Sequence, residues 1–548
     1  MGLGKRTFMT AFVAVLASVL AITVWMTAGH ASTTSTTSAT SAASTAKPVL
    51  TAYEKALSKY LVKLKWAACQ ASVAPAPFQC ATAPAPLSYS NLNGTRITLA
   101  LVRLPAAIPK DRIGSLFVNF GGPGGDGTSL LPQRAATVFS QDIRDHFDLV
   151  SWDTRGTGLS TAVRCFATQA ADAAYFNSVP YFPYPASADA SFWSLNAELG
   201  QDCKQRAAAL LAHMSSQDTA RDLDLLRQDA GDARLNYMGF SYGTVIGAVY
   251  ANLFPHNVRA MVLDGTVDFQ GNAVGDASGD AAKYPVDVRN GVDVAAQATL
   301  GRFLTLCAEA GSAKCAFATG GSLPAKWKTL LARSSAGPIS YAGGTYFYST
   351  LVAITYYDLE KPTAEWPALG TLLQGLYVAS TPGAGIAEAP KTAQQSYPVT
   401  NENEGFDLSQ CSDIEVPARE SVYDRLAVTE NAKVPGFGAF VTYDMTPCAT
   451  WPALHTDAYD GPWNRSATTI LVINSRYDPA TPYQGAVAAV RELGNARLLT
   501  VNGDGHTSED AEPSACRDTA KQAYLISLKL PPRGEVCAVD QLPWGLPG

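Results

Sequence analysis

The stretch Asn236-Tyr237-Met238-Gly239-Phe240-Ser241-Tyr242-Gly243-Thr244-Val245 decides the fold of this chain, because it holds Gly-x-Ser-x-Gly with Ser241 at the centre. An apolar run of strand type precedes the motif, and small and apolar residues at helical spacing follow it to Leu253. A five-residue motif with two glycines also recurs by chance. In a strand–turn–helix frame, however, it predicts a nucleophile elbow, a strained turn for which Gly239 and Gly243 leave room because they lack a Cβ. The helix start then directs free N–H groups toward a developing oxyanion.

Apolar runs typical of strands alternate with helical patterns on both sides of the elbow. Before the alternation begins, the sequence predicts a helix over 49–68 and strands over 85–89 and 95–103. Strands that alternate with helices form a mostly parallel sheet with helices on both faces. With the elbow, this pattern predicts an α/β class chain of α/β-hydrolase fold, with core residues 49–267 and 466–548. The strand-type runs of the alternating part are 115–119, 147–153, 233–238, 259–264, 468–474 and 496–501, with a helix over 215–232.

The alternation breaks between residues 268 and 465. This interval is far longer than the roughly two to six residues of an ordinary strand–helix connection, so we predict an inserted domain. Helical patterns at 294–310, 323–334 and 363–379 make it mainly helical. An insertion at this point of the fold normally lies above the serine, which favours a cap over the active site; the alternative is a remote appendage.

The composition limits the classes of partner. The chain has 548 residues, only 16% of them charged, and a net charge of −6 without basic runs. Nucleic acid is therefore not expected as a partner. No phosphate or dinucleotide motif and no cysteine–histidine cluster is present, so we expect neither a cofactor nor a metal ion.

The N-terminal residues 1–31 predict a signal peptide. Lys5 and Arg6 form a basic start, residues 8–25 an apolar core, and Gly29-His30-Ala31 a small-x-small cleavage site. A retained membrane anchor is the alternative, because the apolar run approaches the roughly 20 residues that span a bilayer. The small residues after the run favour cleavage, and thus a secreted protein with no stable membrane association. Residues 32–48, rich in Ser, Thr and Ala, predict a low-complexity, disordered linker.

Ten cysteines fit export into an oxidising compartment. Sequence alone does not fix which cysteine pairs with which, and pairing between neighbours along the chain is the simplest hypothesis. We expect structural disulfides. The neighbours are Cys69 and Cys80, Cys165 and Cys203, Cys307 and Cys315, Cys411 and Cys448, and Cys516 and Cys537.

A glycine cluster, Phe120-Gly121-Gly122-Pro123-Gly124-Gly125-Asp126-Gly127, directly follows the strand at 115–119. No Gly-Lys-[Ser/Thr] follows, and the dinucleotide-binding spacing is not met, which disfavours a phosphate cradle. In a hydrolase with a nucleophile elbow, an early loop of this kind supplies one oxyanion N–H and the residue after the serine supplies the other. We therefore predict an oxyanion hole from Gly122 and Tyr242, with Gly121 as the alternative to Gly122.

The next loop, Asp153-Thr-Arg155-Gly156-Thr-Gly158, follows the strand at 147–153. Asp153 and Arg155 carry opposite charges close to the predicted site. We interpret them as an ion pair that braces the active-site loops rather than as catalytic groups.

A nucleophilic serine needs a histidine base within hydrogen-bond reach. Only His256, His455 and His506 follow Ser241 in the chain. His256 lies beyond the elbow helix, roughly 20 Å from the serine at 1.5 Å per residue. His455 falls in the insertion. His506 lies in a glycine-flanked loop after a sheet strand, so we predict His506 as the base.

The base needs a carboxylate that fixes its tautomer. Asp478 directly follows a strand, precedes His506 by one strand–helix unit, and lies in the turn Asp478-Pro-Ala-Thr-Pro, which immobilises it. Asp264 and Asp268 are the rivals, because they end the strand after the nucleophile. Asp504 is too close to His506 along a tight turn. We predict the triad Ser241, His506 and Asp478, whose chemistry is acyl transfer.

Several motifs together resemble the secreted tripeptidyl aminopeptidases of actinobacteria, relatives of the proline iminopeptidases within the α/β-hydrolases. The resemblance runs from about residue 60 to the C-terminus, and the cap is its least recognisable part. Phe120 and Asp126 depart from the proline and serine of the family pattern. The matching stretches are Asn119-Phe-Gly-Gly-Pro-Gly-Gly, Asp153-Thr-Arg-Gly-Thr-Gly, Gly239-Phe-Ser-Tyr-Gly-Thr, Leu253-Phe-Pro, Met261-Val-Leu-Asp-Gly, Asp478-Pro-Ala-Thr-Pro, and the tail with Cys516, Tyr524-Leu525, Leu530-Pro531 and Cys537.

The resemblance implies a serine exopeptidase that removes short peptides, typically tripeptides, from free N-termini. Such an enzyme needs a carboxylate that pairs with the ammonium of the substrate. Candidates are Glu402, Glu404, Asp413 and Glu415, with Asp126 as a further one. Asp413 is the first choice because the expected disulfide at Cys411 tethers it. We expect a monomer whose partners are peptides or proteins with a free N-terminus. A secreted esterase or lipase-like hydrolase with the same triad is the alternative, and a binding protein without catalysis is a third class.

Overall fold

The computed structural model describes residues 52–185, 188–276, 279–379, 401–452 and 457–548. Residues 52–548 form one compact unit. The expected signal peptide and linker, as well as His455, lie outside the described residues. Within the described ranges, no helix combines the length and apolar character that a membrane crossing requires.

A ten-stranded mixed sheet forms the centre of the unit, in the order β1-β2-β3-β5-β4-β6-β7-β10-β11-β12. The pairs β1–β2, β2–β3 and β3–β5 are antiparallel, and every later pair is parallel. The strands are β1 Ala67–Ala68, β2 Gln79–Pro86, β3 Arg96–Leu104, β4 Gly114–Asn119, β5 Phe147–Trp152, β6 Leu235–Phe240, β7 Val258–Asp264, β10 Ile470–Tyr477, β11 Ala496–Asp504 and β12 Val536–Ala538. Short hairpins are β8 Ile339–Tyr341 with β9 Gly344–Tyr346, and β13 Gln541–Leu542 with β14 Leu546–Pro547.

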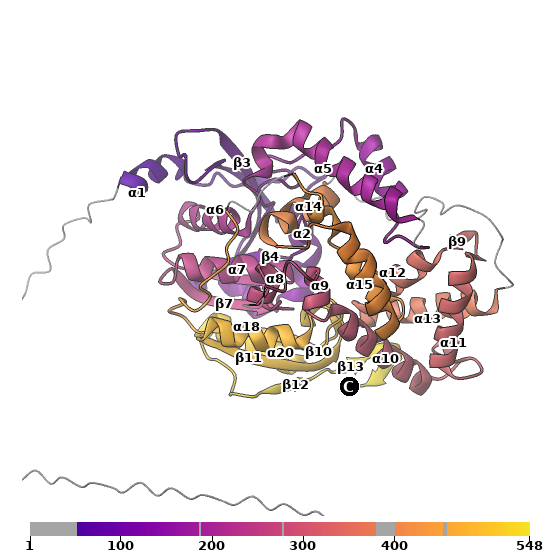
Figure 1. Ribbon diagram of the computed structural model, residues 1–548. Coiled ribbons are helices and arrows are strands. Elements are labelled where there is room, and N and C mark those ends of the chain that lie inside the picture. The colour runs from indigo at the N-terminus through magenta and orange to yellow at the C-terminus, as the bar shows by residue number, and fades with distance from the viewer. Residues whose placement is uncertain (1–51, 186–187, 277–278, 380–400, 453–456) are drawn as a thin grey trace, which may run out of the picture. The chain divides into compact units, whose positions relative to one another are not determined.

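Helices cover both faces of the sheet (Figure 1). One apolar core joins it to α6 Ser216–Asp229, α7 Tyr242–Leu253 and α18 Tyr483–Leu493. A second core joins the other face to α2 Gly127–Val138, α3 Gln141–His146 and α20 Ala515–Ser527. Every residue of β4, β5 and β6 is buried, as expected for parallel strands covered on both sides. The predicted fold class is confirmed.

The interval between β7 and β10 is mainly helical and has an apolar core of its own. The same core includes three residues that precede the elbow in sequence, Phe182, Phe192 and Trp193. They lie in or beside α5 Asp189–Leu211, which follows α4 Gln169–Ser178. The boundaries 268–465 stay a prediction, and the structure adds an earlier segment to this helical layer. Its helices are α8 Phe269–Ala273, α9 Val286–Arg289, α10 Val292–Ala310, α11 Leu323–Ala336, α12 Tyr348–Leu359, α13 Pro362–Val378, α14 Glu402–Asp413, α15 Glu420–Lys433, α16 Phe437–Tyr443 and α17 Thr446–Ala449.

Two expectations near the N-terminus are wrong in their bounds. The helix expected over 49–68 is described only as α1 Ala52–Leu57 with a 3₁₀ turn to Tyr60, after which the chain extends toward β1. The strand expected over 85–89 is instead β2, which ends at Pro86 because its pairing with β3 ends there. Pro84 and Pro86 lie beyond the short β1, on an edge of β2 where proline costs no ladder hydrogen bond.

All ten cysteines form disulfides between neighbours along the chain, so the simplest pairing is the one present. Cys165–Cys203 ties the segment before α4 to α5, and Cys411–Cys448 ties α14 to α17. Five structural disulfides are typical of proteins that fold in an oxidising compartment.

Candidate active site

Ser241 occupies the sharp turn between β6 and α7, with φ 51° and ψ −124°. Positive φ is uncommon for a residue with a Cβ and is strained. The neighbouring glycines make the turn possible: a Cβ on Gly239 would lie 2.3 Å from the Gly243 carbonyl oxygen, and a Cβ on Gly243 would lie 2.6 Å from that of Asn119. The conformation is that of a nucleophile elbow, and it exposes Ser241 at the end of the sheet.

The glycine loop after β4 packs directly against the elbow. A Cβ on Gly121 would lie 2.5 Å from the Phe240 carbonyl oxygen and 2.9 Å from the Ser241 Cβ. The Gly121 N–H donates to Asn119 Oδ1 at 3.0 Å, which favours Gly122 over Gly121 as an oxyanion donor. Tyr242 is the first residue of α7, where a helix leaves its N–H groups without an intrahelical acceptor. The loop and the helix start therefore meet beside the serine.

His506 and Asp478 contact one another at the ends of β11 and β10. The His506 Nδ1 lies 3.0 and 3.1 Å from the two Asp478 oxygens. Asp478 also accepts hydrogen bonds from the N–H of Ala480 and from the N–H and hydroxyl of Thr481, at 2.7–2.9 Å. These donors immobilise the carboxylate and leave Nε2 as the imidazole nitrogen available to a serine.

Gly265 connects the imidazole with the elbow. The Ser241 N–H donates to the Asp264 carbonyl at 3.0 Å. A Cβ on the next residue, Gly265, would lie 3.4 Å from His506 Cε1. The imidazole thus lies beside the strand end that pairs with the serine, so three segments far apart in sequence meet at one edge of the sheet.

The charge environment of His506 favours its protonated form. Burial lowers its pKa, but the carboxylates of Asp478, Glu360 and Asp264 more than offset burial and raise the pKa to about 9. A base held by a buried carboxylate is what acyl transfer requires.

The rival acids bind other groups. Asp264 accepts from Ser508 and Glu509, Asp268 caps α8 through the Gly271 N–H, and Asp504 pairs with Arg302. The rival histidine His256 is exposed after the C-terminus of α7.

The candidates for ammonium binding lie in different surroundings. Asp413 is buried, and its carboxylate accepts hydrogen bonds from the Ser216 N–H at 3.0 Å and from the Tyr242 hydroxyl. Glu404 is buried and accepts from the Cys165 N–H at 2.5 Å. Glu415 is exposed.

Two further candidates complete the account. Asp126 is buried at the start of α2, and the Glu402 side chain lies outside the described residues. The role of Asp413 as the ammonium partner stays a prediction. Both oxygens of its carboxylate already accept hydrogen bonds from protein donors.

Sequence reasoning missed a group of acids that the helical layer places near His506. The Glu360 carbonyl accepts the His506 N–H at 2.8 Å. Burial raises the pKa of the Glu360 carboxyl to about 7, His506 lowers it, and Asp478 and Asp444 raise it further. Burial also raises the pKa of Asp444, to about 6, and that of Asp287, which hydrogen-bonds Asp444. No sequence motif marks these acids, because packing between distant helices brings them together.

Asp153 and Arg155 do not form the ion pair that the sequence predicted. The prediction is wrong because each residue bonds to a different partner. Arg155 is buried and makes a bidentate pair with Asp222 at 2.7–2.8 Å. Asp153 accepts from the Thr128 N–H and hydroxyl at 2.8 and 3.0 Å. Asp153 thus binds the start of α2, whereas Arg155 binds α6.

One group of metal-ligand type occurs in the described part of the chain, formed by His213, Asp218 and Asp457. Arg155 lies 3.4 Å from the Asp218 carboxylate. Arg221 pairs with the same carboxylate at 2.9 Å, so Asp218 already has two cationic partners.

Comparison with known proteins fits this geometry. A family model described as TAP-like protein matches residues 432–537, and one described as alpha/beta hydrolase fold matches residues 116–304. The tripeptidyl aminopeptidase of Streptomyces lividans is 29% identical over 496 residues, which cover 88% of this chain and 87% of that protein. Carboxylesterase B of Mycobacterium tuberculosis is 30% identical over 478 residues, covering 84% and 86%. Serine protease Hip1 of the same organism is 29% identical over 501 residues, covering 86% and 91%. The chain therefore belongs to the TAP-like family of α/β-hydrolases and is a serine hydrolase.

Proposed function

We propose that this protein is a secreted serine exopeptidase that releases short peptides, in the first place tripeptides, from free N-termini. The observation that carries the proposal is the group formed by Glu360, Asp444 and Asp287 beside His506. These three residues are half-buried, and partial loss of solvent raises the pKa of the carboxyls of Glu360 and Asp444. A cationic ligand would stabilise their charged forms, and a peptide N-terminus is an ammonium ion. An ester substrate gives such a group nothing to bind.

In the proposed reaction, the Ser241 hydroxyl attacks the scissile carbonyl while His506 Nε2 takes its proton. Asp478 holds the imidazole through Nδ1 and stabilises the imidazolium. The N–H groups of Gly122 and Tyr242 bind the oxyanion, and each such donor contributes about 3–4 kcal/mol in comparable sites. His506 then protonates the leaving amine, and water releases the N-terminal fragment from Ser241.

Glu360 is the acid that we propose as the main partner of the substrate ammonium, with Asp444 beside it. Its carbonyl is bonded to the His506 N–H, so the residue has a fixed place next to the base. The position of the ammonium relative to Ser241 would set how many residues are released. Asp413, the choice from sequence, is bonded to Tyr242 and Ser216 instead, and its variants distinguish the two.

Export is supported by the five disulfides, and the N-terminal pattern of basic, apolar and small residues supports removal of residues 1–31. We also propose that the enzyme acts as a monomer on peptides or proteins with a free N-terminus.

The test compares a tripeptide anilide that has a free N-terminus with its N-acetylated twin. We expect cleavage of the first and a loss of at least about tenfold in kcat/KM for the second, since acetylation removes the charge. Mass spectrometry of a peptide digest reads the size of the released fragments. Equal rates on both anilides, or activity on acyl esters alone, would support the esterase, which the name of the relative carboxylesterase B also favours. Ser241→Ala is the control, and labelling by a fluorophosphonate that persists in it would refute the nucleophile.

A further inference from the structure

Asp264 lies at the end of β7, between the strands that carry the proposed nucleophile and the proposed acid. It is fully buried. Its carbonyl accepts the Ser241 N–H at 3.0 Å. Its carboxylate accepts the Ser508 N–H at 3.0 Å, the Ser508 hydroxyl at 2.9 Å and the Glu509 N–H at 3.1 Å. One residue therefore binds the elbow through its main chain and the histidine loop through its side chain.

The loop that Asp264 holds is itself under strain. Thr507, directly after His506, has φ 56°. A β-branched residue rarely adopts this conformation, and it persists only where the surrounding contacts impose it. The three donors to Asp264 come from the two residues that follow, so its carboxylate is placed to impose that conformation.

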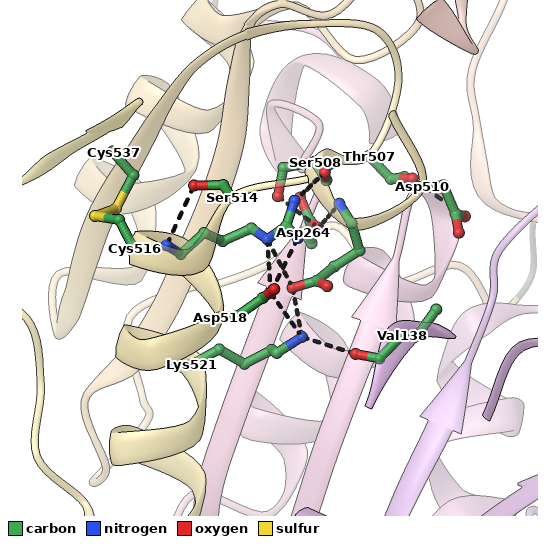
Figure 2. A network of polar contacts seen from close by, with 12 residues as sticks. Val138, Asp264, Thr507, Ser508, Asp510, Ser514, Cys516, Asp518, Lys521 and Cys537 are labelled. Atoms are coloured by element: carbon green, nitrogen blue, oxygen red, sulfur yellow. Dashed lines mark hydrogen bonds and ion pairs between the residues drawn. A yellow bond between two sulfur atoms is a disulfide. The ribbon is translucent and has the colours of Figure 1, made fainter. Parts of the chain in front are cut away.

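A group of buried charged residues also supports the turn that follows His506 (Figure 2). Glu509 lies 3.2 Å from Arg517 and 2.7 Å from Lys521, both on α20. Arg517 also donates to the carbonyls of Ser508 and Glu512. The disulfide Cys516–Cys537 fixes the start of α20 to β12. The turn after His506 is thus held between Asp264 on one side and Arg517 on the other.

We infer that Asp264 is a positioning residue, which sets the separation between Ser241 and His506 without touching the imidazole. The inference rests on the proposed triad. It differs from the idea that Asp264 is an alternative triad acid, because the donors to its carboxylate are those of Ser508 and Glu509. Its negative charge also contributes to the raised pKa of His506.

The test uses Asp264→Asn, which keeps the size of the side chain but turns an amide N–H₂ toward one of three donors. The control is Asp148→Asn on β5. Asp148 is also buried and accepts from the Ala106 N–H, but it bonds Arg103 and Arg112 rather than the histidine loop. Active-site titration with a fluorophosphonate corrects both for inactive protein.

We expect Asp264→Asn to lower kcat about tenfold with KM nearly unchanged, because a misplaced base affects the transition state alone. The acid limb of kcat/KM should also move to lower pH, since a negative charge near His506 is lost. Asp148→Asn should lose thermal stability but keep the kcat and pH profile of the wild type. Ser508→Ala, which removes one donor and leaves the backbone in place, should lower kcat in the same direction by a smaller factor.

A wild-type kcat and pH profile in Asp264→Asn overturns the inference. If Asp264→Asn does not fold, a wild-type kcat and pH profile in Ser508→Ala overturns the inference. A parallel measurement on Ser241→Ala separates this failure from that of the triad: activity that survives in Ser241→Ala refutes the proposed function, whereas its loss there, with Asp264→Asn unaffected, refutes the positioning role alone.

Discussion

The main-chain N–H of His506 donates a hydrogen bond to the main-chain carbonyl of Glu360 at 2.8 Å. The bond joins the loop of the proposed base to the segment between α12 and α13. Because of this hydrogen bond, the acids of the helical layer lie in the same site as the proposed triad.

Asp478→Asn should lower kcat by about 10⁴-fold while the protein stays folded. The amide cannot hold the imidazole in the tautomer that the serine needs, and this is the loss seen for the equivalent change in other triads. The measurement is steady-state kinetics on the anilide, with circular dichroism as the check on folding. Asp268→Asn, at a rival acid position, is the comparison. A similar loss of kcat in that variant would identify Asp268 as the triad acid instead of Asp478.

The pH dependence of kcat/KM should differ between charged and uncharged substrates. The base works when neutral, and the pKa of His506 is raised to about 9, so the rate on an uncharged ester should rise with pH until about 9 and then level off. A free-amine peptide loses its own charge above a pKa of about 8, so its rate should fall again on the alkaline side. An acid limb near pH 6 would show that His506 is not held by these carboxylates.

Glu360→Gln should raise KM for a free-N-terminal peptide by about 10–100-fold at pH 8 and leave an ester substrate nearly unchanged. Its carboxyl has a pKa of about 7, so it is charged at pH 8 and loses that charge only as the pH falls below 7. Asp413→Asn is the matched comparison, because its carboxylate is bonded to Tyr242 and should act on kcat instead. If Asp413→Asn alone raises KM, the ammonium partner is the one chosen from sequence.

Gly505→Ala should disturb the contact between the segment that joins α12 to α13 and the histidine loop. Gly505 has φ +86°, and a Cβ there would lie 2.3 Å from Pro362 Cδ and 2.6 Å from the Glu360 carbonyl oxygen. Gly534 has φ +76° and nothing within 4 Å of the same position, so Gly534→Ala carries the backbone strain without the clash. We expect Gly534→Ala to lose about 1–2 kcal/mol of stability, and Gly505→Ala to lose more and to lose kcat as well. Equal kcat in the two would contradict a coupling between the segments.

The fold class and the predicted triad both rest on local signals in the sequence, and the triad stays a prediction. Ser241, Asp478 and His506 each lie in a short signal: two glycines around a strained turn, a proline-bounded turn after a strand, and a glycine-flanked loop. The strands of the sheet could be predicted from apolar runs in the sequence, because both faces of these strands are buried. These features need only neighbours along the chain.

The rest depends on contacts between distant segments. Glu360 and Asp444 have no motif, because helices from separate parts of the chain bring them together. Trp193 belongs to the core of the helical layer although it precedes the elbow, and nothing in its local sequence indicates that. Arg155 was expected to pair with Asp153, but a helix of later sequence supplies Asp222 instead.

The order of the strands has a consequence for the newly made chain. Ser241 follows β6, whereas His506 follows β11, close to the C-terminus. A polypeptide still being synthesised therefore carries its proposed nucleophile for more than 250 residues without a base. On the proposed triad, a chain that ends before residue 506 has the nucleophile but not the base, so an unfinished copy is expected to be inactive.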